Sequence, residues 1–190
     1  MSFQVSGLPL APFAPLFGLS DVELAQRDIV RQTADTAPGF PCRVSLVDAA
    51  PGETVLLLNF EHLAVASPYR SRHAILVRES AQEARVPVGV VPEVLERRLL
   101  SVRAFDGRGM MVDADVVDGV SSRSVFERML GASGVQYLHV HNAKQGCFAA
   151  RVDRAREALT GLGKRPRHSN VLPLGTAQTN AGRRAQSPSF

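Results

Sequence analysis

Two histidines separated by one residue are the clearest candidates for chemistry in this sequence. His139 and His141 lie in the run YLHVHN. Alternate side chains of an extended strand lie on the same face, so the two Cα atoms would be about 6.8 Å apart. The pair could supply two imidazole ligands to one metal ion if a third ligand came from elsewhere. Because histidine titrates near neutral pH, either ring could instead act as a general base.

The position of Cys147 depends on the register of the hairpin that follows these histidines. We predict a four-residue loop over residues 143–146, because glycine at its last position readily adopts the left-handed conformation. This register places Asn142 opposite Cys147 and His141 opposite Phe148. The cysteine then lies on the opposite face from the histidines. A five-residue loop is the alternative, and it would bring Cys147 beside His141.

A second group of polar residues, which includes Arg43, Tyr69, Arg70 and His62, is expected at strand ends and in loops. Side chains converge there at the rim of a sheet. Its arginines present planar groups that suit phosphate or carboxylate. We therefore predict a shallow pocket for a small anionic or polar ligand. The catalytic candidates are His139, His141 and His62, and the ligand-binding candidates are Arg43, Arg70, Tyr69, Asn142 and Cys147.

A metal-stabilised or purely structural binding module is the alternative to this pocket. A third metal ligand would have to come from His62, His73 or a carboxylate, whereas His168 is a poor candidate. We assign no metal ligand and no cofactor, and the sequence leaves catalysis and simple binding both open. A histidine-triad hydrolase is excluded because position 143 is alanine.

Other catalytic motifs do not occur. There is no phosphate-binding glycine loop, nucleophile elbow or CxxC pair, which excludes dinucleotide-binding, P-loop, serine hydrolase and thioredoxin-like classes. Asp113 and Asp115 resemble an acidic metal motif, but they alternate with Val112 and Val116. We predict that the aspartates face solvent, opposite an apolar face of the same strand.

The elements that must position these residues are short strands and short helices. The pattern predicts a single α+β domain over residues 1–162, with a mostly antiparallel sheet of about seven or eight strands and three or four helices. The expected strands are 3–6, 42–47, 54–60, 73–79, 100–105 and 110–116, followed by the histidine hairpin. Residues 55–58 are apolar on both faces, which predicts that the strand 54–60 is central in its sheet. The expected helices begin with a capping box at Ser20 and Glu23, cover 92–100 and 122–130, and end with one capped by Asp153 that reaches residue 162.

The positive charge of the chain is unevenly distributed. Five of its 22 Lys and Arg residues lie after residue 159, together with none of its 18 Asp and Glu residues. Residues 163–190 are therefore predicted to be a basic, disordered tail. The near-neutral remainder has no Trp and two Tyr, so it lacks the stacking surfaces of nucleic-acid modules, and we expect no specific nucleic-acid partner.

No membrane partner is expected either. Prolines at 9, 12 and 15 interrupt the apolar N-terminal segment, and no run approaches the roughly 20 apolar residues that a membrane helix needs. We predict a cytoplasmic protein whose two cysteines are thiols. A homodimer that pairs through the edge strand 110–116 is an open alternative to a monomer.

Five stretches of the sequence together resemble a family of small bacterial proteins known only as a domain of unknown function. They are GFPCRVSL (39–46), PGETVLLLNFEH (51–62), SPYR (67–70), MMVDADVVDG (110–119) and YLHVHNAKQGCFAARV (137–152). The resemblance covers residues 3–155 and implies a single-domain cytosolic protein, but no reaction. It draws attention to Cys42, Arg43, His62, Tyr69, Arg70, His139, His141, Asn142, Cys147 and Arg151.

Overall fold

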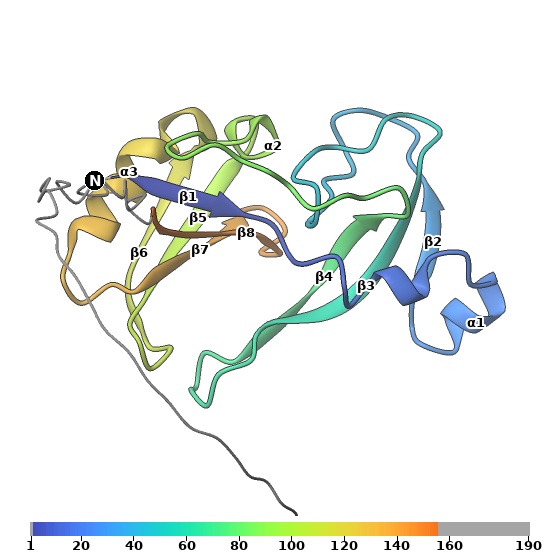
Figure 1. The fold of residues 1–190 in the computed structure, drawn as a ribbon, viewed down its shortest axis with the longest axis horizontal. Coiled ribbons are helices and arrows are strands. Elements are labelled where there is room, and N and C mark those ends of the chain that lie inside the picture. The colour runs from blue at the N-terminus through green and yellow to red at the C-terminus, as the bar shows by residue number, and fades with distance from the viewer. Residues whose placement is uncertain (1, 156–190) are drawn as a thin grey trace, which may run out of the picture. The chain divides into compact units, whose positions relative to one another are not determined.

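The computed structural model describes residues 2–155. In this part of the chain, eight strands form two antiparallel sheets, accompanied by three α-helices (Figure 1). The α+β class and the number of strands are therefore confirmed, although the strands divide between two sheets. The predicted helix ending at residue 162, His168 and the predicted basic tail lie outside the described residues.

The larger sheet has five strands in the order β1-β8-β7-β5-β6, each antiparallel to its neighbour. The bounds are β1 (Phe3–Ser6), β5 (Leu99–Phe105), β6 (Met111–Asp118), β7 (Tyr137–Asn142) and β8 (Phe148–Arg154). The smaller sheet has the order β2-β3-β4, with β2 (Val30–Thr33), β3 (Thr54–Leu63) and β4 (Ser71–Arg78).

The helices are short and lie between or beside the strands (Figure 1). They are α1 (Asp21–Ala25), α2 (Glu93–Glu96) and α3 (Ser122–Gly131), with 3-10 turns η1 (Ala14–Leu16) and η2 (Gly119–Ser121). The predicted capping box at α1 is confirmed: the Ser20 hydroxyl accepts from the Glu23 amide, and the Glu23 carboxylate accepts from the Ser20 amide. No helix among residues 2–155 is long and apolar enough to span a bilayer.

The two faces of the larger sheet have different environments. Leu100, Val102 and Ala104 of β5 point into a dry core, where they meet Phe126 and Leu130 of α3. The residues between them face the other way, because successive side chains of a strand alternate. The face opposite α3 therefore carries Ser101 and Arg103 of β5 and His139 and His141 of β7.

The smaller sheet positions the second half of the site. Val55, Leu56 and Leu58 of β3 are buried, and β3 lies between β2 and β4, as the apolar run predicts. The core of this sheet also contains Phe148 of β8. The two sheets therefore meet at the beginning of β8.

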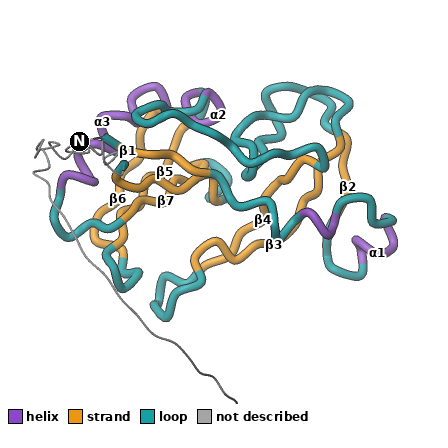
Figure 2. The backbone as a smooth tube through the Cα atoms, viewed as in Figure 1, coloured by secondary structure: helices purple, strands orange, loops and turns teal. Residues whose placement is uncertain are grey.

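The predicted strand over residues 42–47 is wrong. This segment makes only isolated bridges, Pro41 to Asp48 and Cys42 to Leu76, and it is part of the long loop between β2 and β3 (Figure 2). Its backbone folds back on itself, since the Leu46 amide donates to the Cys42 carbonyl at 3.1 Å and Leu46 has φ +52°. A left-handed residue ends strand geometry.

Three smaller predictions also need correction. Asp153 does not cap a helix, because it lies within β8 and pairs with Arg151 at 2.7 Å. The helix expected over 92–100 ends at Glu96, and β5 begins at Leu99. Asp113 and Asp115 of β6 are partly exposed, but both contact Arg128 of α3. The predicted apolar face of this strand is wrong, because Val112 and Val116 are exposed.

Candidate functional site

The histidine hairpin adopts the predicted register. The Asn142 amide donates to the Cys147 carbonyl at 2.9 Å, and His141 pairs with Phe148. Gly146, at the end of the four-residue loop, has φ +72°. The register shifts between Val140 and His141, which leaves one extra residue in β8. As predicted, Cys147 lies opposite Asn142 rather than beside His141.

Four histidines from both sheets form one cluster, which we call the histidine cluster: His62, His73, His139 and His141. His62 Nε2 lies 2.8 Å from His73 Nδ1. The ring of His141 lies 5.2 Å from that of His62 and 5.3 Å from that of His73, and His139 lies 5.4 Å from His62, measured between centroids. The fully buried Phe148 stacks on His62 at 4.6 Å.

A bulge in β3 supplies the position of His62. Glu61 pairs with Arg72, but Leu63 pairs with Ser71, so His62 is an extra residue on its strand. A bulge re-aims a side chain relative to a regular strand. His73 lies on β4, opposite Phe60 of β3. Its ring stacks on that of His62 with an interplanar angle of 15°.

Burial keeps these imidazoles neutral. It lowers the pKa of His139 to about 2 and that of His62 to about 4, and neighbouring positive charges act in the same direction. Burial also lowers the pKa of His141 to about 3, although its hydrogen bond to the Gly146 carbonyl opposes the shift. At neutral pH each ring therefore has one unprotonated nitrogen.

Arg103 is a site residue that the sequence analysis missed. It lies opposite His139 on β5 and is half-buried. Burial lowers its pKa, and its positive charge contributes to the low pKa values of the four histidines. Among residues 2–155, its side chain has no carboxylate partner and makes one long contact, 3.4 Å to the Ser101 hydroxyl.

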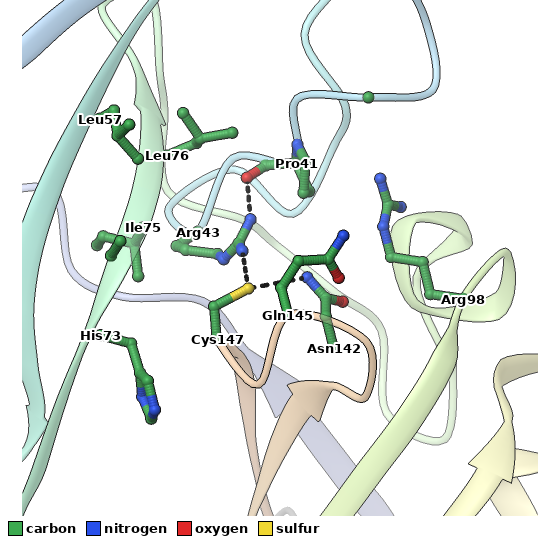
Figure 3. A pocket seen from close by; sticks show the side chains of 12 residues that line it. Pro41, Arg43, Leu57, His73, Ile75, Leu76, Arg98, Asn142, Gln145 and Cys147 are labelled. Carbon is green, nitrogen blue, oxygen red and sulfur yellow. Dashed lines mark hydrogen bonds between the residues drawn. The ribbon is translucent and has the colours of Figure 1, made fainter.

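A second buried arginine lies beside a cavity next to the cluster. Arg43 is 3% exposed. Its Nε donates to the Phe148 carbonyl at 2.6 Å, its Nη1 donates to the Pro41 carbonyl, and its Nη2 donates to Cys147 Sγ at 3.1 Å. The amide of Asn142 also donates to this sulfur, at 3.4 Å. Figure 3 shows Arg43 and Asn142 both contacting Cys147, while Arg43 also contacts Pro41.

The cavity, which we call the Arg43 pocket, has a volume of about 420 Å³. One wall is apolar and comes from β3 and β4, and the other is polar (Figure 3). The polar lining consists of Arg43, His73, Arg98, Asn142, Gln145 and Cys147. Because His73 belongs to both this lining and the histidine cluster, the two sites are adjacent.

The structure thus distributes the predicted site residues over three places. Arg43, Asn142 and Cys147 line the Arg43 pocket, and His62, His139 and His141 lie in the cluster behind His73. Arg70 is 63% exposed and pairs with Glu61. Tyr69 lies on the ring of Phe105, which separates it from His139.

A comparison with protein families matches residues 39–154 to the family described as "Protein of unknown function (DUF1203)". The chain belongs to this family. The matched DUF1203 region contains every residue of the histidine cluster and the whole polar lining of the Arg43 pocket. Comparisons with curated proteins and with solved structures give no match.

Proposed function

We propose that this DUF1203 protein binds a small anionic ligand in the Arg43 pocket. The observation that carries the proposal is the buried guanidinium of Arg43, which has no carboxylate partner among the described residues. Removing a charge from water is costly, and buried charges are normally paired with an opposite charge. An anion in the adjacent cavity would supply that charge.

The rest of the lining suits a small organic anion. Arg98 lines the cavity but is held by Asp48 through contacts of 2.6 and 3.0 Å, so it contributes little net charge. Gln145 and Asn142 offer amide groups, and Asn142 Oδ1 is buried without a partner in the described region. A cavity of this size, with one apolar wall and a few polar groups, is typical of small-molecule sites.

His73 adds a proton acceptor to the same cavity. Burial lowers its pKa, so the ring is neutral at pH 7 and can accept a proton from a bound ligand. Its Nδ1 contacts His62 at 2.8 Å, which orients the ring. The proposed function needs only binding, and His73 is the histidine that a catalytic step in this pocket would use.

Thermal unfolding with inorganic phosphate, sulfate, acetate and malonate tests this proposal. A ligand at 100 times its dissociation constant stabilises the folded state by about 2.7 kcal/mol, so at least one anion should raise Tm by several degrees. The variant Ala74→Trp should abolish the shift, because Ala74 is an exposed residue of β4 that lines the pocket.

Ala114→Trp is the matched control, since Ala114 is an exposed alanine of β6 outside the pocket. It should keep the full anion-induced shift. The proposal fails if none of the four anions shifts the Tm of the wild-type protein, or if both tryptophan variants respond equally.

A further inference from the structure

We infer that His62, His73 and His141 form a binding site for one transition-metal ion of the zinc class. One ring nitrogen from each of these residues lies within 4.8 Å of the other two. They come from β3, β4 and β7, so the site joins the two sheets. It shares His73 with the lining of the Arg43 pocket, but the inference does not depend on anion binding there.

The spacing is near that of a metal centre. Zn–N bonds of about 2.0–2.1 Å in a tetrahedral site place ligand nitrogens roughly 3.4 Å apart. His62 Nε2 and His73 Nδ1 are 2.8 Å apart and the widest spacing in the set is within 4.8 Å. Small ring rotations would therefore open the close pair and draw the third nitrogen inward.

His141 is already oriented as a ligand. Its Nδ1 lies 2.9 Å from the Gly146 carbonyl, and a carbonyl can only accept, so Nδ1 carries the proton. Nε2 is therefore the nitrogen with the free lone pair. Metal-bound histidines usually donate their other ring N–H to a carbonyl or carboxylate in this way, which fixes the ring.

Two buried ring nitrogens of the histidine cluster have no hydrogen-bond partner among residues 2–155. They are His62 Nδ1 and His139 Nδ1. Buried polar atoms without partners are costly. Histidines that served only to fill the interface between the sheets would be less stable there than apolar rings, so these residue types favour a binding role for the cluster.

The ligand set selects the class of metal. Three imidazole nitrogens suit zinc, copper, nickel or iron, whereas magnesium and calcium require oxygen ligands. Three protein ligands also leave a fourth position open, as in catalytic zinc centres. His73 reaches the wall of the Arg43 pocket, so the ion would lie directly behind that cavity.

Metal titration of the full-length protein tests the inference. Chelator-treated protein should bind one Zn²⁺ per chain in isothermal titration calorimetry, and Co²⁺ should give the visible absorption of a low-coordinate nitrogen site. His73→Ala should weaken binding by about 100-fold or more. His73 is half-buried at the surface of β4, so this variant is expected to fold, which circular dichroism checks.

His139→Phe is the matched control, because His139 belongs to the same cluster but not to the three-residue ligand group. It should retain one Zn²⁺ per chain with an affinity within a few-fold of the wild type. Absence of stoichiometric binding by the wild-type protein would overturn the inference. Equal affinity in folded His73→Ala protein, or loss of binding in folded His139→Phe protein, would overturn the assigned ligands. The Ala74→Trp variant should still bind Zn²⁺, so the two proposals can fail independently.

Discussion

Burial of His139 and His141 should cost metal-free protein about 3 kcal/mol of unfolding free energy between pH 6.5 and pH 5. His139 and His141 are 2% and 1% exposed, and burial lowers their pKa values to about 2 and about 3. In the unfolded chain both titrate near 6.5. Well above pH 6.5 they are neutral in both states and contribute no pH dependence.

The sign follows from proton binding. Below pH 6.5 the unfolded chain binds protons that the folded protein does not, so acid favours unfolding by about 1.4 kcal/mol per pH unit for each histidine. The loss should continue until the folded-state pKa of about 3 for His141 is reached. Since domains have about 5–15 kcal/mol of stability in total, this loss is large.

Urea unfolding at pH 7.5, 6.5, 5.5 and 5.0, with a chelator present, measures the effect. His141→Phe removes one of the buried titrating groups, so the slope of free energy against pH should fall by about 1.4 kcal/mol per pH unit. Paired carboxylates such as Glu53 have lowered pKa values and contribute only at more acidic pH. Equal unfolding free energies at pH 7.5 and pH 5 would show that the histidines are solvated in the folded protein.

Phe148→Ala should destabilise the protein by about 3–5 kcal/mol, the usual cost of deleting a fully buried phenylalanine ring. Phe148 is 1% exposed and belongs to the core of the smaller sheet. Its ring also contacts His62, His139 and His141 at centroid distances of 4.6, 5.0 and 5.9 Å. The variant should therefore also disturb the histidine cluster.

Phe13→Ala separates these two effects. Phe13 is 1% exposed in the same core, and its aromatic partner is Phe60 rather than a histidine. Chemical denaturation should give similar losses for the two alanine variants, while Zn²⁺ affinity should fall only in Phe148→Ala. A loss below about 1 kcal/mol in Phe148→Ala would mean that the ring is less tightly packed than the structure indicates.

Local features were predictable from the sequence because their determinants lie within a few residues. The capping box at Ser20 and the register of the histidine hairpin depend on one hydroxyl and one glycine, and both are confirmed. The apolar run of β3 correctly indicated a central strand. The segment 42–47 has the composition of a strand, but Leu46 adopts a left-handed conformation that no local pattern favours.

The site depended on contacts between distant segments. No local pattern indicates that a bulge would direct His62 toward β7, or that β4 would bring His73 beside it. Arg103 alternates with apolar neighbours just as a solvent-facing arginine would, and only the pairing of β5 with β7 reveals that it faces His139. The sequence therefore allowed the types of site residue to be predicted, but not which of them are in contact.

The contact of Arg43 with the Phe148 carbonyl has a consequence for biosynthesis. The two residues are 105 positions apart, so a growing polypeptide contains Arg43 long before Phe148 has been translated. Until the Phe148 carbonyl and Cys147 are present, the Pro41 carbonyl is the one of its three acceptors that has been synthesised, so most of the guanidinium must stay hydrated. The loop that carries Arg43 should therefore pack only after the β7–β8 hairpin has formed, both during translation and during refolding from denaturant.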